Sequence, residues 1–152
     1  MRVFWTGFSH LHLTFDYLGI VDKEDLKLIR RTLSEMAEET KAFELRLDRI
    51  VLGPDERDPK MFWATVFQDG FVGIFQKKLH QKLEENGFNL KEKSFIPHIV
   101  LATAKGNQLK GKHTNVHLRG KFKVENLNLY SSQTYAKGAT KYKLLETFPL
   151  QK

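Results

Sequence analysis

Two histidines lie in similar local strings, and each is a candidate for acid–base chemistry. The first string is His12-Leu13-Thr14-Phe15 and the second is His98-Ile99-Val100-Leu101. Histidine can donate or accept a proton near neutral pH, which general acid–base catalysis requires. In a strand, residues i and i+2 point to the same face, so Thr14 would offer its hydroxyl beside His12. A hydroxyl there can hydrogen-bond a phosphate oxygen as negative charge develops, so the pattern favours phosphoryl chemistry.

The other histidines have less specific interpretations. His10 would share a face with His12, but no third ligand follows at metal-binding spacing, so we expect no metal. We expect His10 at the edge of a cleft, His80 on the solvated side of a helix, and His113 and His117 on a basic face. Each histidine of the catalytic pair also has a purely structural interpretation, as a polar-face or hydrogen-bonded residue.

The elements that would position these residues follow from the spacing of apolar side chains. Apolar residues at helical spacing predict helices over 22–40, with Asp22 as N-cap, and over 71–86, with a stop at Asn86-Gly87. Alternation or β-rich composition predicts strands over 10–17, 43–52, 61–67, 95–103, 116–119, 122–130 and 141–148. Gly138 is expected in the turn before the last strand.

Pairs of strands separate the two predicted helices, which favours antiparallel sheets and the α+β class. The chain has 152 residues and no long linker or low-complexity segment, so we expect a single domain over 1–152. Each half has one helix and one histidine-bearing strand. Two lobes related in this way would bring the two histidines face to face.

Composition narrows the functional classes. No apolar stretch approaches the ~20 residues of a membrane span, and the absence of cysteine excludes disulfides and thiolate chemistry. We therefore expect a cytoplasmic protein. The net charge of +7 favours polyanionic partners such as RNA. The basic residues are concentrated in a stretch without Asp or Glu that contains Lys105, Lys110, Lys112, Arg119, Lys121 and Lys123.

Beyond the histidines themselves, the flanking residues carry a resemblance. The string 11–15 followed by Leu18-Gly19, and the string 95–102, resemble the two signatures of the 2H phosphoesterase superfamily. Within it, the chain is most similar to the RNA 2′,3′-cyclic phosphodiesterases, also called 2′-5′ RNA ligases. The likeness extends to 129–132 and 138–142 and covers the chain from about Trp5 to Leu150.

The resemblance implies a bilobal fold, with two antiparallel sheets around a central cleft and the helices packed outside. It implies an enzyme without metal or cofactor that opens a 2′,3′-cyclic phosphate at an RNA end to a 2′-phosphate; some members also join or cleave 2′-5′ linkages. By this likeness His98 is the general base, His12 the general acid, and Thr14 holds a phosphate oxygen.

We expect further residues near the two signatures to contact substrate. Trp5, Phe8, Tyr17 and Tyr130 are the aromatic candidates for a cleft in which a base stacks. The full set of expected substrate-binding residues is His10, Tyr17, Thr103, Lys105, Tyr130 and Ser131.

Three features depart from the family pattern. Val100 stands where the family has Thr or Ser, and losing one such donor typically lowers a rate about 10²–10³-fold. Thr103 stands where an arginine is common, and simple alternation places it on the face opposite His98. We expect the strand and helix that usually precede the first signature to be missing from this sequence. We also expect a monomer, with a dimer through an exposed strand edge as the alternative.

These features leave three functions open. The first is an active RNA 2′,3′-cyclic phosphodiesterase, with or without 2′-5′ RNA ligase activity. The second is a catalytically weakened member that binds RNA ends or cyclic nucleotides without turnover, which Val100 and Thr103 favour. The third is an enzyme with the same histidine pair that acts on another cyclic phosphate, such as ADP-ribose 1″,2″-cyclic phosphate.

Overall fold

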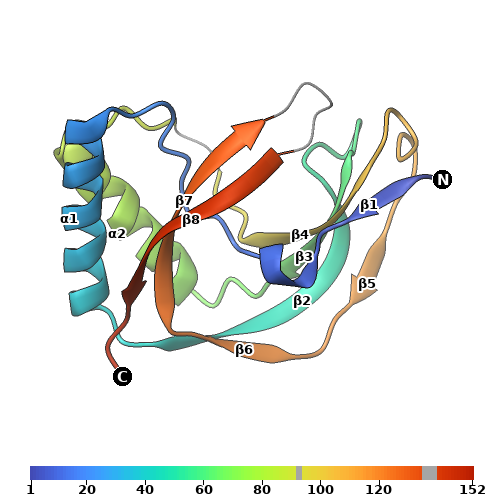
Figure 1. Cartoon of the computed structure of the whole chain (residues 1–152). Coiled ribbons are helices and arrows are strands. Elements are labelled where there is room, and N and C mark those ends of the chain that lie inside the picture. Colours follow the sequence, from blue (N-terminus) through green and yellow to red (C-terminus); the bar gives the residue numbers. More distant parts are fainter. Residues whose placement is uncertain (92–93, 135–139) are drawn as a thin grey trace.

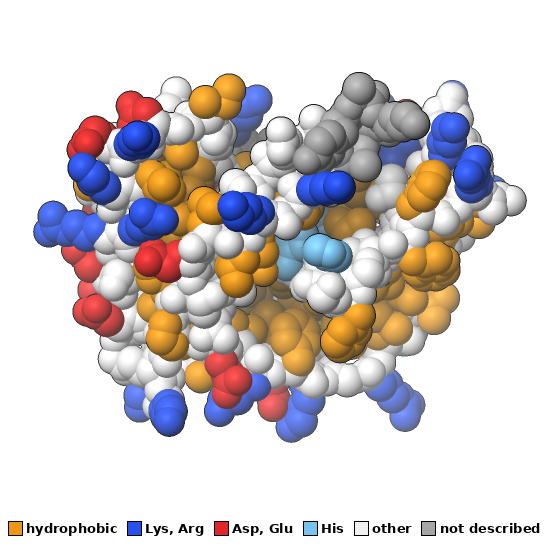
Figure 2. Space-filling model, viewed as in Figure 1, with side chains coloured by type: hydrophobic (Ala, Val, Ile, Leu, Met, Phe, Trp, Pro, Cys, Tyr) orange, Lys and Arg blue, Asp and Glu red, His pale blue; other side chains and the backbone are white. Residues whose placement is uncertain are grey.

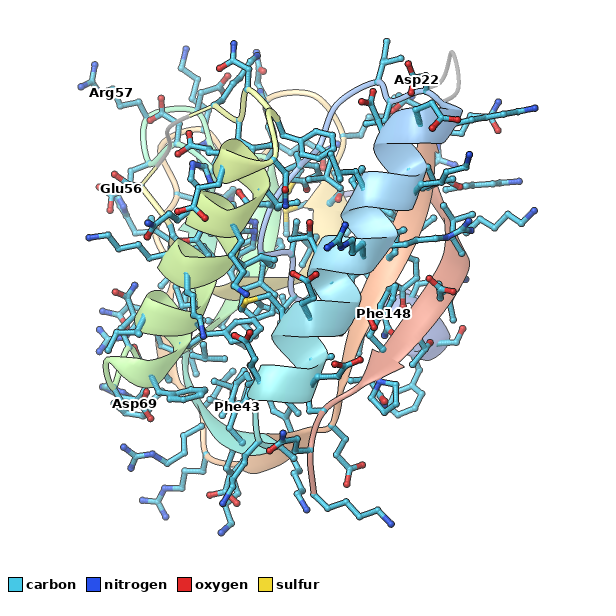
Figure 3. The ribbon with its side chains drawn as sticks, turned by 90° about the vertical axis from the view of Figure 1, so that its left-hand side faces the viewer. Asp22, Phe43, Glu56, Arg57, Asp69 and Phe148 are labelled. Carbon is cyan, nitrogen blue, oxygen red and sulfur yellow. The ribbon has the colours of Figure 1, made fainter. Side chains whose placement is uncertain are left out.

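The computed structural model describes residues 1–91, 94–134 and 140–152, and Gly138 lies outside them. Two helices stand side by side at one end of the molecule, and a long curled sheet forms the other end (Figures 1 and 3). The elements, in chain order, are β1 (Val3–Trp5), a 3-10 helix (Phe8–His10), α1 (Lys23–Glu39), β2 (Phe43–Gly53), β3 (Met61–Val66), α2 (Phe71–Glu85), β4 (His98–Ala104), β5 (Asn115–His117), β6 (Lys121–Val124), β7 (Asn126–Thr134) and β8 (Thr140–Pro149).

The strands form two sheets. In the larger sheet the order is β1-β4-β3-β2-β5, and β6 pairs with the first part of β2. The smaller sheet is the β7-β8 ribbon. Every pairing between these strands is antiparallel, so the predicted α+β class with antiparallel sheets is confirmed.

The helices form where the apolar spacing predicts them. Asp22 caps α1 through a capping box: the Asp25 N–H donates to the Asp22 carboxylate at 2.8 Å, and the Asp22 N–H donates to the Asp25 carboxylate at 3.2 Å. The buried stripe of α1 packs with α2 and β7 in one core, whose members include Ile29, Leu33, Met36, Leu79, Leu83, Leu127 and Leu129. No helix in the described part of the chain has the length and apolar character needed to cross a membrane.

The predicted strand over 10–17 is wrong. The chain forms β1 first, which was not predicted and which occupies the edge of β4 at Ala102–Ala104. It then leaves the sheet through the 3-10 helix and returns to β4 only at Leu13, in a single bridge with Ile99. Because β1 occupies part of the edge of β4, the segment 11–17 is extended but forms no continuous ladder of hydrogen bonds with β4. The predicted strand over 122–130 is also divided, into β6 and β7.

Candidate active site

The first signature lies along the edge of β4, beside the second signature. Leu13 is bridged to Ile99, and the partners of an antiparallel bridge point to the same face of a sheet. The neighbours of Leu13 in the extended segment, His12 and Thr14, therefore point to the other face, which is the face of His98. The pairing thus brings the two histidine strings to one side of the sheet.

A β-bulge in β4 brings Thr103 to the same side. The register of β3 and β4 passes from Trp63↔Val100 to Phe62↔Ala102, so β4 has one extra residue, Leu101. Thr103 then pairs with Met61, whose side chain is on the face of Trp63. The expectation that Thr103 lies opposite His98 is therefore wrong, because simple alternation does not hold across a bulge.

Both imidazoles are anchored in the same way. The Nδ1 of His12 lies 2.8 Å from the carbonyl oxygen of His10, and the Nδ1 of His98 lies 2.7 Å from that of Ile96. A carbonyl oxygen only accepts, so each Nδ1 carries a proton and donates it. Each Nε2 is then the atom left to exchange a proton with a substrate. Two hydrogen bonds to the residue two positions earlier thus give both histidines the same tautomer.

The environment of His98 favours its neutral form. Burial lowers the pKa of the His98 imidazole, its hydrogen bond to Ile96 opposes that shift, and the charge of His12 lowers the pKa further. The last effect shows that the two histidines lie within electrostatic range of each other. The His98 ring is also stacked on Trp63, with ring centroids 3.7 Å apart and planes inclined by 17°. A neutral imidazole with a free Nε2 is suited to accept a proton.

The environment of His12 is aromatic and hydroxylated. Its ring meets Tyr142 edge-on at 4.6 Å and lies 5.8 Å from Tyr130. Burial raises the pKa of the Tyr142 hydroxyl, and the charge of Tyr17 and a hydrogen bond with it raise that pKa further. Tyr130 of β7 and Tyr142 of β8 therefore lie against the first histidine. Tyr17, from the segment 11–17, contacts Tyr142.

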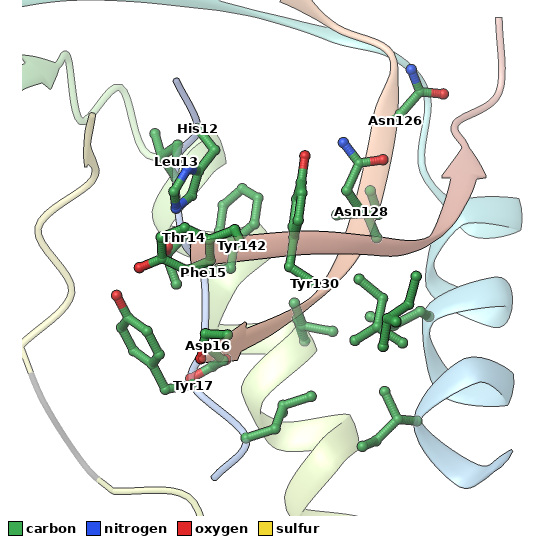
Figure 4. Close-up of a pocket in the computed structure, with 18 of the residues that line it drawn as sticks. His12, Leu13, Thr14, Phe15, Asp16, Tyr17, Asn126, Asn128, Tyr130 and Tyr142 are labelled. Carbon is green, nitrogen blue, oxygen red and sulfur yellow. The ribbon is translucent and has the colours of Figure 1, made fainter. Parts of the chain in front are cut away.

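A cavity of about 840 Å³ opens beside this group (Figure 4). His12 and Thr14 line it from the segment 11–17, and the ribbon β7-β8 supplies the opposite wall. His98 is not among its lining residues, so the cavity extends away from the histidine pair toward the apolar faces of α1 and α2. Predicted substrate-binding residues in its lining are Tyr17, Tyr130 and Ser131.

The remaining predicted residues are not in the lining of this cavity. His10 is exposed in the 3-10 helix and contributes its backbone carbonyl to His12. Lys105 is exposed just after the end of β4. Trp5 pairs with Ala102 and so lies on the face opposite Thr103, which makes its predicted place in the cleft wrong. Trp63 and Tyr142 were missed as site residues, because neither is in a histidine signature.

The prediction that His80 is a solvated surface group is also wrong. Its Nδ1 lies 2.9 Å from the Asp16 carboxylate, and its side chain is only 19% exposed. Asp16 belongs to the extended segment that carries His12 and Thr14, so this contact joins that segment to α2. Burial raises the pKa of the Asp16 carboxyl, although the hydrogen bond from His80 opposes the shift.

The basic stretch forms a less continuous patch than its sequence suggests. Lys121 is paired with Glu44 at 3.3 Å, and Lys123 with Glu125 at 3.7 Å. In the space-filling view, histidine side chains lie at a hollow in the middle of the face, and Lys or Arg side chains lie above it (Figure 2). Among the described residues, no group of three or more histidine or acidic side chains is arranged to hold a metal ion.

Curated proteins similar to this chain share one description. An RNA 2′,3′-cyclic phosphodiesterase of Methanocaldococcus jannaschii is 29% identical over 132 residues, which are 82% of this chain and 72% of that protein. An RNA 2′,3′-cyclic phosphodiesterase of Bacillus subtilis is 24% identical over 64% of this chain and 54% of that protein. The chain thus spans about half the length of the second relative.

Solved structures show the same fold. The crystal structure of TT0787 of Thermus thermophilus superimposes with a TM-score of 0.83 at 26% identity, covering 98% of this chain and 82% of that one. The structure of E. coli LigT with 3′-AMP has a TM-score of 0.74 at 23% identity, covering 97% and 81%. The family model described as the 2′-5′ RNA ligase superfamily matches residues 6–136. The chain therefore belongs to the 2′-5′ RNA ligase superfamily.

Proposed function

We propose that this protein hydrolyses 2′,3′-cyclic phosphate ends of RNA to 2′-phosphates by a two-histidine mechanism without a metal ion. The observation that carries the proposal is the pair of imidazoles on one side of the sheet, each with its Nδ1 proton held by a carbonyl and its Nε2 left for substrate. The family membership and the names of the similar phosphodiesterases support the substrate class.

In the proposed reaction, His98 removes a proton from water through Nε2, and the water oxygen attacks phosphorus. The bond from phosphorus to O3′ breaks, and protonated His12 gives its Nε2 proton to the leaving O3′. The products are a 2′-phosphate and a free 3′-hydroxyl. The lowered pKa of His98 supports its assignment as the base, because the base must be neutral before it acts.

The hydroxyl of Thr14 holds a phosphate oxygen in this proposal. Val100 supplies no matching hydroxyl, and Thr103 is the nearest alternative on β4 because the bulge turns it to the same side. Tyr17, Tyr130 and Ser131 line the adjoining cavity and would contact the nucleoside. His10 and Lys105 are exposed residues outside that lining and stay predicted substrate contacts. We also propose one two-lobed domain over 1–152, with the helices outside, acting as a monomer.

The test is hydrolysis of a 2′,3′-cyclic nucleotide and of a short RNA with a cyclic end, both in excess EDTA. We expect turnover that is lost in His12→Ala and in His98→Ala. The matched control is His113→Ala, which removes an exposed histidine that belongs to neither signature and should retain activity. Full activity in both catalytic variants would remove the proposal.

The second candidate function is binding of RNA ends without turnover, and the missing hydroxyl at Val100 is the observation that favours it. It predicts salt-sensitive binding of a 2′-phosphate end with no product after hours. The same histidine pair would serve hydrolysis of ADP-ribose 1″,2″-cyclic phosphate and reactions of 2′-5′ linked RNA, so its geometry does not distinguish these activities. The same assay with these two substrates does.

A further inference from the structure

Trp63 is the largest side chain in contact with His98, and its position is tightly determined. The indole is 9% exposed and stacks on the imidazole with centroids 3.7 Å apart. On β2, a Cβ at Gly53 would lie 2.6–2.7 Å from three adjoining atoms of the indole, which is closer than real contacts allow. The indole therefore packs directly on the backbone of Gly53, and a glycine is needed there.

Two contacts together define the orientation of His98. The hydrogen bond from Nδ1 to Ile96 sets the direction of one ring edge, but by itself it allows the ring to rotate about that bond. The stacked indole sets the plane of the ring. The Nε1–H of Trp63 is buried and has no acceptor among the described residues, so packing rather than hydrogen bonding holds the indole.

We propose that Trp63 is a positioning residue for His98, which fixes the imidazole plane so that Nε2 faces the reacting phosphate. This inference rests on the proposed function only where it speaks of the reaction; the stack itself is tested without substrate. Misplacing a catalytic group by about 1 Å typically lowers a rate by about 10²-fold. A residue that only fills space in the sheet would instead affect stability.

The chain provides a direct measurement, because it has two tryptophans, Trp5 and Trp63. Trp5 is 77% exposed and lies on the face opposite the site, so Trp5→Phe leaves Trp63 as the single indole fluorophore. A protonated imidazole quenches an indole stacked on it more strongly than a neutral imidazole does. The fluorescence of Trp5→Phe should therefore fall as the pH decreases, with a midpoint below that of an ordinary histidine, because burial lowers the pKa of His98.

Other charged groups face this part of the sheet and must be separated from His98. Cross-strand pairing places Arg49 of β2 and His117 of β5 on the same face as Trp63, and the charge of His12 acts on His98. In the Trp5→Phe background, the fluorescence transition should vanish in His98→Gln and persist in His12→Gln and His117→Gln. A transition that survives His98→Gln contradicts the stack.

The catalytic test uses Trp63→Leu and Trp63→Phe, with Trp5→Phe as the control. We expect kcat to fall about 10²-fold in Trp63→Leu and less in Trp63→Phe, with KM within about threefold. The acidic limb of kcat/KM should move to higher pH in Trp63→Leu, because water reaches His98. Unchanged kcat and an unchanged acidic limb in both Trp63 variants would overturn the proposal. If the parent protein shows no turnover, the proposed function is contradicted, and the fluorescence experiment still tests the stack.

Discussion

Removal of the Thr14 hydroxyl is the sharpest test of how the phosphate is held. Thr14 is half-buried beside His12 and lines the cavity, and valine has nearly the same shape without the donor. Val100 offers no hydroxyl on the second strand, so Thr14→Val removes the principal hydroxyl of the two signatures. Loss of one such donor raises the barrier by about 2.7–4 kcal/mol, which is about 10²–10³-fold in rate.

The assay is the rate of cyclic-nucleotide hydrolysis in EDTA, with kcat and KM determined separately. Because the hydrogen bond strengthens as charge develops, we expect the loss mainly in kcat. Thr14→Ser is the matched control, since it retains a hydroxyl at the same position and should keep most of the activity. Thr14→Val with a rate within about threefold of the parent, and with an unchanged melting temperature, would refute this role.

Three further predictions concern β4, which carries the second signature, and the contact that supports the segment 11–17. Val100→Thr should keep or raise kcat in the same assay, because it restores the missing donor; a large loss in a folded variant contradicts this. The kcat/KM profile should have its acidic limb below pH 6.5, because the active base is neutral His98, whose pKa burial lowers, and a limb above that pH argues against His98 as base. His80→Leu should lower the free energy of unfolding by about 1–3 kcal/mol at pH 7, since it leaves the largely buried Asp16 carboxylate without that partner. Urea unfolding measures this loss, and adding Asp16→Asn should recover part of it.

Much of the fold could be predicted from the sequence because its signals are local. The apolar stripe of α1 and its Asp22 cap need no knowledge of the rest of the chain, and in the first part of β2 Phe43 and Leu45 are less exposed than Glu44 and Arg46. The segment 11–17 alternates just as well but is not a strand, because β1 occupies part of the edge of β4. Competition between two segments for one edge is a tertiary effect that alternation does not report.

The site residues that belong to the two sequence signatures were predicted, and those that reach the site through tertiary packing were missed. The two histidines and Thr14 are visible as strings, whereas the Trp63 stack requires the pairing of β3 with β4 and the glycine at position 53 of β2. Tyr142 approaches His12 only because β8 is paired with β7 beside it. Such contacts join residues far apart in the chain, and no single-strand pattern contains them.

The bulge at Leu101 makes a prediction that separates the two possible faces of Thr103. If Thr103 faces the site, an arginine there can reach the phosphate, and hydrogen bonds to charged groups contribute about 1.5–3 kcal/mol. Thr103→Arg should then lower KM for the cyclic phosphate about tenfold or more and make it more sensitive to salt. The neighbouring side chain on β1, Phe4, is 53% exposed, so this face has room for the longer side chain.

Trp5→Arg is the matched control. Trp5 follows Phe4, the β1 partner of Thr103, so the substitution adds the same charge nearby but on the opposite face of the sheet. It should leave KM and its salt dependence unchanged. Equal effects of the two arginines would mean that the added charge acts through the overall field of the protein, and a silent Thr103→Arg would mean that alternation continues through Leu101. A lower KM in Thr103→Arg alone requires the bulge, since only the extra residue turns position 103 toward His98.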